Sequence, residues 1–219
     1  MATQKIEFDK IGERLYETGV DHVVLYEYSD GQYTNGVAWN GVTGITENKS
    51  GAEPSPLYAD NIKYLVLKSL EEYGITIECY TYPKEFEKCN GMATLAKGVT
   101  IGQQARSTFG LSFRTRIGND TVGEDYGYKL HLVYGCDASP SEENNDTIND
   151  SPEAKTFSYE VTTTPVAVAD YKNTSCVTIS SIDTNKTNLE ALEKILYGSE
   201  EAAPRLPMPD ELKTIFAEG

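Results

Sequence analysis

The 219-residue chain has few of the side chains that metal sites depend on. Its two histidines, His22 and His131, are far apart, and no two of its four cysteines form a C-x-x-C pair. A zinc site would need ligands at closer spacing. We therefore expect no bound metal or cofactor, and four reduced, partly buried thiols. The cysteines are Cys79, Cys89, Cys136 and Cys176.

Catalytic and membrane patterns are also lacking. The chain has no G-x-S-x-G elbow, P-loop, H-E-x-x-H or dinucleotide fingerprint. A glycosidase needs two converging carboxylates, and nothing singles out a pair among the 34 acidic residues. No apolar run is long enough to cross a membrane, and MATQKIEFDK has no signal-peptide pattern. We expect a protein that is not an enzyme, does not bind membranes and is not exported by the general secretory route.

The net charge of −15 is unevenly distributed. Residues 84–129 carry 7 basic and 5 acidic side chains (+2), whereas residues 1–83 carry 6 and 13 (−7) and residues 130–219 carry 6 and 16 (−10). Because there is no basic stripe, tight binding to nucleic-acid phosphates is not expected. The 15 tyrosines favour strands and surfaces that become buried on assembly, since the ring is apolar and the hydroxyl can find a partner.

Alternation of apolar and polar residues predicts a mainly antiparallel β protein of about eight strands, as a sandwich or partly closed barrel with one flanking helix. The clearest strand holds Phe109, Leu111 and Phe113 on one face. The expected strands are Val20–Tyr28, Tyr33–Ile45, Ile62–Leu70, Ile75–Tyr82, Val99–Ala105, Ser107–Ile117, Tyr128–Tyr134, Phe157–Val168 and Ser175–Ile182.

The stretch Tyr58–Pro83 predicts a central β-hairpin. Two apolar runs, 62–70 and 75–82, flank Glu71-Glu72-Tyr73-Gly74, where Gly74 can supply a positive φ. The first run also fits a helix, but its β-rich surroundings favour a strand. A short helix is expected over Pro83–Cys89, ended by Asn90-Gly91.

Two further helices are expected near the C-terminus. Thr187–Tyr197 has an apolar stripe, with Thr187 or Asn188 as its cap and Gly198 at its end. A shorter helix is expected over Asp210–Phe216, and its apolar residues need a surface to pack against.

The remaining segments are predicted to be loops within one domain, 1–219. An N-terminal arm covers 1–19, and a C-terminal extension covers 199–219. Residues 46–59 contain glycine and prolines and are predicted to form a long loop, either functional or flexible. The acidic segment 137–154 lacks the glycine and terminal glutamate of an EF-hand, which favours a solvated loop over a calcium site.

Parts of the sequence resemble the major tail proteins of long-tailed bacteriophages, the subunits of the tail tube. SLEEYGITIECYTYPKEFEKCNG resembles the central segment of that family. GQQARSTFGLSFRTRIGNDTVGEDYGYKLHLVYGCDASPSE, followed by TINDSPEAKTFSYEVTTTPV, resembles its second half. The segments follow one another in the expected order. The match depends on extended similarity, because no short catalytic motif is involved.

The resemblance implies a structural virion protein, assembled in the cytoplasm of the host bacterium. Six subunits would form a ring, their hairpins joining into an inner β-barrel, and rings would stack into a hollow tube through which the genome leaves. Such closure removes exposed sheet edges, and head-to-tail stacking gives an open-ended assembly. The implied partners are further copies of the chain, the tape measure, the terminator and baseplate or tip proteins, with DNA passing through without specific binding.

The resemblance also assigns the long loop to contacts between successive rings. These residues are Lys49, Ser50, Gly51, Ala52, Glu53, Pro54, Ser55, Pro56, Leu57 and Tyr58.

An acidic tube wall would let DNA slide, whereas a basic one would hold it. The candidates for this wall are the acids expected at hairpin tips, and three arginines are expected to pair with acids at subunit contacts. The acids are Glu71, Glu72, Asp120, Glu124 and Asp125; the arginines are Arg106, Arg114 and Arg116. The alternative function is a carbohydrate-recognising β-sandwich of a virion or cell surface, which would need a concave aromatic groove in the monomer. An enzyme is the third possibility.

Overall fold

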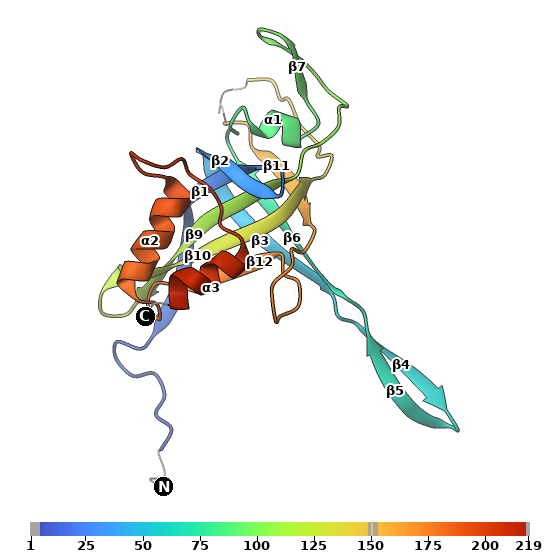
Figure 1. Ribbon diagram of the computed structural model, residues 1–219, viewed down its shortest axis with the longest axis vertical. Helices are drawn as coiled ribbons and strands as arrows, with labels where there is room; N and C mark the ends of the chain where they lie inside the picture. Colours follow the sequence, from blue (N-terminus) through green and yellow to red (C-terminus); the bar gives the residue numbers. More distant parts are fainter. Residues whose placement is uncertain (1–4, 149, 151–152, 218–219) are drawn as a thin grey trace.

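The computed structural model describes residues 5–148, 150 and 153–217. Its largest element is an eight-stranded antiparallel sheet with the order β2-β1-β9-β10-β11-β6-β3, in which β12 also pairs with β10 (Figure 1). The strands of this sheet are β1 (Leu15–Ser29), β2 (Gln32–Ala38), β3 (Val42–Gly51), β6 (Glu71–Cys79), β9 (Phe109–Asn119), β10 (Gly123–Ala138), β11 (Phe157–Thr163) and β12 (Cys176–Ser180). The mainly antiparallel β fold is thus confirmed, but the sheet is not closed into a barrel.

The first core fills the concave side of this curved sheet. The alternation predicted for β9 is confirmed, since Phe109, Leu111 and Phe113 all point into this core. From the other half of the sheet, β6 and β11 contribute residues such as Ile77 and Tyr159. Because both halves of one sheet bury their apolar faces against each other, the body has a sandwich-like interior without a closed ring of strands.

A short helix, α1 (Phe86–Cys89), closes one end of the first core. Phe86 is fully buried, and its ring centroid lies 4.6 Å from that of Trp39 and 4.8 Å from that of Tyr159. The Trp39 indole N–H donates to the carbonyl of Thr81, 2.9 Å away, so its one polar group is satisfied. The short helix predicted after Pro83 is therefore confirmed, and it covers one end of the first core.

The second core lies on the other face of the sheet, under α2 (Lys186–Tyr197) and α3 (Pro209–Ala217). Both helices expected near the C-terminus are confirmed, and the second flanks the sheet together with the first instead of leaving one flanking helix. The Tyr26 hydroxyl donates to the carbonyl of Leu196 at 2.9 Å, which fixes α2 to the sheet. The cap predicted at Thr187 or Asn188 is wrong, because the Asn185 side chain accepts the bond from the Thr187 N–H at 2.9 Å. Gly198, with φ of 80°, ends the helix as expected.

The predicted hairpin between residues 62–70 and 75–82 is wrong. The chain reverses instead at Asp60 and Asn61, whose φ angles are 49° and 62°. Asp and Asn tolerate this left-handed region better than most residues, and such pairs form tight hairpin turns. As a result β5 (Ile62–Lys68) pairs with β4 (Pro54–Ala59), whereas β6 pairs with β3 and β11. Glu71 and Glu72 therefore lie within β6 rather than at a hairpin tip.

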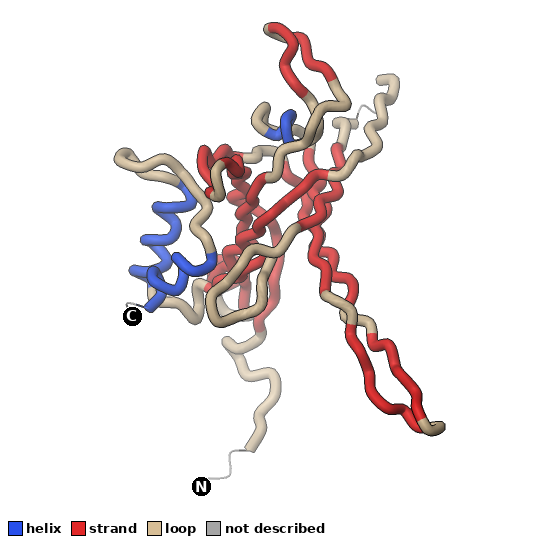
Figure 2. The backbone as a smooth tube through the Cα atoms, turned by 45° about the vertical axis from the view of Figure 1, so that its right-hand side comes forward, coloured by secondary structure: helices blue, strands red, loops and turns tan. Residues whose placement is uncertain are grey.

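The segment 46–59 is likewise not a loop. β3 continues to Gly51, and β4 follows after two residues. Pro54 and Pro56 concealed this strand from the sequence pattern, but proline is tolerated in an edge strand, and both strands of a two-stranded hairpin are edges. β4 and β5 together form an arm that extends far from the body (Figure 2). We call residues 52–70 the arm.

A second, smaller hairpin projects from the opposite end of the molecule (Figure 1). It consists of β7 (Ala93–Ala96) and β8 (Val99–Ile101), with its turn at Lys97 and Gly98. The strand expected over Val99–Ala105 is therefore shorter than predicted. The strand that pairs with it, β7, was not predicted.

The terminal and loop segments agree in part with expectation. Residues 5–14 contain no helix or strand, but β1 begins at Leu15, within the N-terminal segment 1–19 that was predicted to lack a regular element. Phe8 and Ile11 are exposed by 81% and 80%, so they do not dock on their own body. Residues 139–156 contain no strand or helix where they are described. Residues 1–4, 149, 151–152 and 218–219 of the predicted segments lie outside the described residues.

All four cysteines are free, with Cys176 partly buried and the others fully buried, as expected. Among the described residues, no helix is long and apolar enough to cross a membrane.

Candidate assembly surface

The arm exposes an unusual amount of apolar surface for a chain with a net charge of −15. Every residue of β4 and β5 is exposed. The large apolar side chains along it, with their exposed fractions, are Leu57 (44%), Tyr58 (70%), Ile62 (63%), Tyr64 (68%), Leu65 (38%), Val66 (39%), Leu67 (55%) and Leu70 (89%). Contiguous apolar surface of this kind marks interaction sites in soluble proteins.

The charge of the arm also differs from that of the rest of the chain. It carries two acidic residues, Glu53 and Asp60, and two basic residues, Lys63 and Lys68. The arm is therefore neutral. Depletion of net charge together with exposed aromatic and aliphatic residues is typical of the centre of a protein–protein interface.

An isolated two-stranded hairpin is marginally stable in water, because neither face is packed. In this arm Leu57 pairs with Leu65 and Ser55 with Leu67 across the strands, but no third strand or helix among the described residues covers either face. Cross-strand pairs of this kind contribute only about 0.2–1 kcal/mol each. The contacts within the arm therefore stabilise it only weakly.

The root of the arm continues the ladder of β3 and β6. Gly51 has φ of 81°, and a Cβ there would lie 2.1 Å from the carbonyl oxygen of Leu70, so only glycine fits. Beyond it, the Ala52 N–H donates to Leu70 O and the Ser69 N–H donates to Glu53 O, both at 3.3 Å. The arm therefore leaves the body in a direction that backbone hydrogen bonds define.

The ten residues predicted to contact the next ring all lie on one strand of this feature or at its root. Lys49, Ser50 and Gly51 end β3, and the last five belong to β4. Sequence reasoning predicted the facing strand over Ile62–Leu70 but paired it with residues 75–82, so Ile62, Tyr64 and Leu67 were not assigned to this surface. The Asp60-Asn61 pair between two apolar segments was the signal that could have found it.

The arginines predicted for subunit contacts have partners within their own chain. Arg114 donates to both carboxylate oxygens of Asp21, from Nε to Oδ1 at 2.6 Å and from Nη2 to Oδ2 at 3.0 Å. Arg116 Nε donates to the same carboxylate at 3.1 Å. Arg106 donates from Nη1 to the carbonyl of Ala138 at 2.8 Å. The bonds of Arg114 and Arg116 tie β9 to β1, and the bond of Arg106 ties the segment before β9 to β10. The contact of these arginines with another subunit stays a prediction.

Hydrogen bonding by Arg114 holds the pKa of the Asp21 carboxyl well below its usual range, although partial burial opposes this. A carboxyl whose folded pKa is depressed stabilises the fold above its unfolded pKa of about 3.9, and this contribution is lost as the pH falls toward the folded value.

We expect Asp21→Asn to lower the free energy of unfolding at pH 7 by about 1–2 kcal/mol, because Arg114 loses a charged partner at a site that is only partly solvated. The deficit relative to the native chain should shrink as the pH falls below 4. Urea unfolding at pH 7 and pH 3.5 measures both effects. Asp30→Asn, in the exposed β1–β2 turn, is the matched control. An equal deficit at both pH values would contradict the assignment.

The acids predicted for the lumen do not form one cluster. Asp120, in the β9–β10 turn, accepts from the Gly12 N–H at 2.9 Å and lies 3.9 Å from Arg14, so it holds the N-terminal segment. Glu124 and Asp125 line a hollow with Arg114 and Arg116 between β9, β10 and α2. The structure thus brings two predicted acids together with two predicted arginines. Glu71 and Glu72 line a different groove at the base of the arm. Their place in a lumen stays a prediction.

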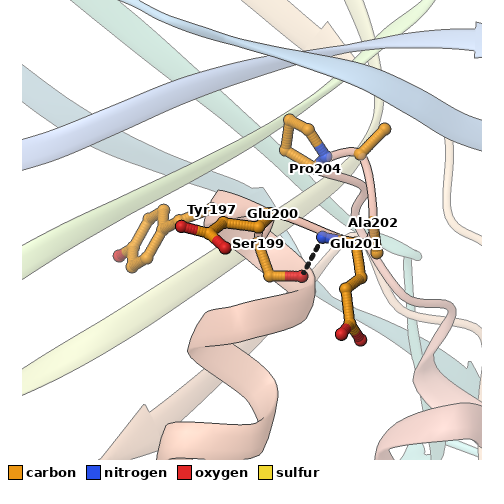
Figure 3. A pocket seen from close by; sticks show the side chains of 8 residues that line it. Tyr197, Ser199, Glu200, Glu201, Ala202 and Pro204 are labelled. Carbon is orange, nitrogen blue, oxygen red and sulfur yellow. Dashed lines mark hydrogen bonds between the residues drawn. The ribbon is translucent and has the colours of Figure 1, made fainter.

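A further hollow lies at the end of α2 and is open to solvent (Figure 3). It is formed by a turn in which the Glu201 N–H donates to the Ser199 hydroxyl at 3.2 Å and the Ser199 N–H donates to the carbonyl of Ala202 at 2.9 Å. Tyr197 is its single aromatic residue. This hollow lacks the aromatic lining that a carbohydrate-binding groove needs.

Comparisons with known proteins give little further guidance. No family model matches the chain. No curated protein matches its sequence. Among solved structures, a chain of the cryo-EM structure of the anti-feeding prophage (AFP) baseplate, 6-fold symmetrised, matches with a TM-score of 0.37 and 8% identity, over 80% of this chain and 97% of that chain. A likeness of this degree carries no argument about function.

Proposed function

We propose that this protein is a structural virion protein, the subunit of the tail tube of a long-tailed bacteriophage. The observation that carries the proposal is the arm, a neutral, apolar two-stranded hairpin with both faces exposed. A hairpin of this kind is only marginally stable by itself, and another subunit that covers it would stabilise it. The sequence resemblance to tail tube subunits points to the same role independently of the arm.

In this proposal six copies form a ring, and the arm of each copy contacts the next ring. The rings stack into a tube through which the genome passes. The remaining tail proteins, namely the tape measure, the terminator and the baseplate or tip, cap or fill the tube. The inner wall carries net negative charge, so that DNA phosphates slide past it without being held.

Electron microscopy of the purified protein tests this proposal, together with sedimentation over a wide concentration range. We expect rings or tubes whose population increases with concentration, because mass action favours burial of the arm. Cryo-EM of the tubes would then show whether acidic residues dominate the inner wall. A compact monomer at every concentration, even with other tail proteins present, would count against the assembly, and an inner wall rich in Lys and Arg would overturn the sliding argument.

A further inference from the structure

The β7–β8 hairpin is a second protrusion that the body leaves uncovered. Leu95, Val99 and Ile101 are exposed by 68%, 47% and 38%, and Lys97 stands at its tip. Residues 88–119, which include this hairpin, contain five basic residues and no acidic one. Lys97 forms no ion pair with any residue that the structure describes, whereas Lys88 lies 2.6 Å from Glu27. The hairpin is therefore an apolar projection with an unpaired positive charge at its end.

A groove of the opposite charge lies at the base of the arm, between the ends of β6 and β11. Glu72 and Glu160 share the outer face here, because Glu160 pairs with Thr76 across the β6–β11 ladder and successive residues of a strand alternate between faces. Leu70 lies beside them on the same face, whereas Glu71 and Tyr73 point to the other one. Both acids are exposed, and neither forms an ion pair within the described part of the chain. Leu70 is 89% exposed, which leaves an apolar surface beside the carboxylates.

A chain cannot place its own hairpin in its own groove. The two features lie at opposite ends of β6, since Glu71 begins this strand at the groove and Cys79 ends it near α1 and the hairpin. The strand rises about 3.3 Å per residue, which separates its ends by roughly 25 Å. The hairpin also projects away from the body, on the side opposite to the arm (Figure 1). Any contact between hairpin and groove must therefore join two copies.

We propose that the β7–β8 hairpin of one copy docks in the groove at the base of the arm of a copy in the next ring. Lys97 meets the carboxylates of Glu72 and Glu160, while Leu95 and Val99 cover Leu70. The charges of the two surfaces are complementary, and a contact between opposite ends repeats from ring to ring without closing. This inference rests on the proposed tube and adds to it a second contact between rings, separate from the tip of the arm.

Charge reversal tests this contact. Lys97→Glu places a third negative charge beside two carboxylates, and every subunit of a ring repeats the repulsion. We expect rings to form as in the native protein, while the protein concentration needed for tube growth rises about tenfold or more. Combining it with Glu72→Lys and Glu160→Lys restores the complementary charges and should bring the threshold back toward the native one.

Lys194→Glu, on the exposed face of α2, makes the same change in net charge far from the groove and is the matched control. Tubes at the native threshold with Lys97→Glu would overturn the inference, and so would an equal loss with Lys194→Glu or a failure of the rings themselves. If the native protein forms no rings or tubes, the proposed function fails and not this contact alone.

Cross-linking identifies the partner directly. Tubes grown from equal amounts of unlabelled and ¹⁵N-labelled protein are treated with a carbodiimide, which joins amines to nearby carboxylates. Mass spectrometry should find Lys97 joined to Glu72 or Glu160 in peptide pairs of mixed isotope. Mixed pairs that join Lys97 only to carboxylates elsewhere in the chain would overturn the assignment.

Discussion

Replacing the arm by a two-residue Asn-Gly turn should give a folded monomer that forms no tubes. Gly51 and Glu71 are paired in the β3–β6 ladder, so a tight turn can join them without moving either strand. The removed residues 52–70 leave the body intact, because their side chains are exposed and pack on neither core. We expect the melting temperature of the monomer to change by only a few degrees, whereas tube growth fails at every accessible concentration.

Circular dichroism melting and electron microscopy measure the two outcomes separately. Asn61→Gly is the matched control, because glycine accepts the positive φ at the tip and keeps the arm. This variant should form tubes like the native protein. Long tubes of normal repeat from the shortened protein would show that the arm does not join the rings.

The largest loss of stability is expected for Phe86→Ala. The ring is fully buried and contacts Trp39, Phe109 and Tyr159, with centroids 4.6–5.8 Å apart. Removing it leaves a cavity beneath α1 and should lower the free energy of unfolding by about 3–5 kcal/mol. Urea unfolding of the monomer, made in the background without the arm so that assembly does not interfere, measures this loss.

Lys84→Ala serves as the control for Phe86→Ala, since this exposed side chain lies just before the same helix. It should change the free energy of unfolding by less than about 0.5 kcal/mol. A loss below about 1 kcal/mol for Phe86→Ala would mean that packing of α1 on the first core does not stabilise the fold as proposed.

The parts of the fold that sequence alone predicted are those that depend on local alternation. In β9, Phe109 and Leu111 face one core while Ser112 faces the other, and the period of two residues is visible without any knowledge of partners. The stripe of α2 is equally local, because Leu189, Leu192 and Leu196 share one helix face.

The errors concern pairing, which a local pattern does not determine. Residues 75–82 alternate as a strand, and residues 62–70 were predicted to be one because of their β-rich surroundings. The predicted partner of residues 62–70 depended on where the turn was placed, after this segment or before it. The turn was predicted at Gly74, although its backbone is extended and a Cβ there would meet Val161 O at 2.9 Å. The glycine is needed for close approach of β11 to β6 rather than for a turn. Of the candidate site, the sequence predicted the strand over residues 62–70, whereas residues 54–59 were predicted to be a loop and the pairing of the two was missed.

The prolines of β4 have a consequence for the time before assembly. A free strand edge is a template on which another chain can add a strand, and that is how β-rich proteins aggregate. Pro54 and Pro56 carry no N–H, so the edge of β4 offers fewer donors to an incoming strand than β5 does. In the proposed assembly, newly made subunits would thus stay apart at high concentration, because their arms would not join at random. The fit of side chains, rather than backbone pairing, would decide which surface the arm accepts.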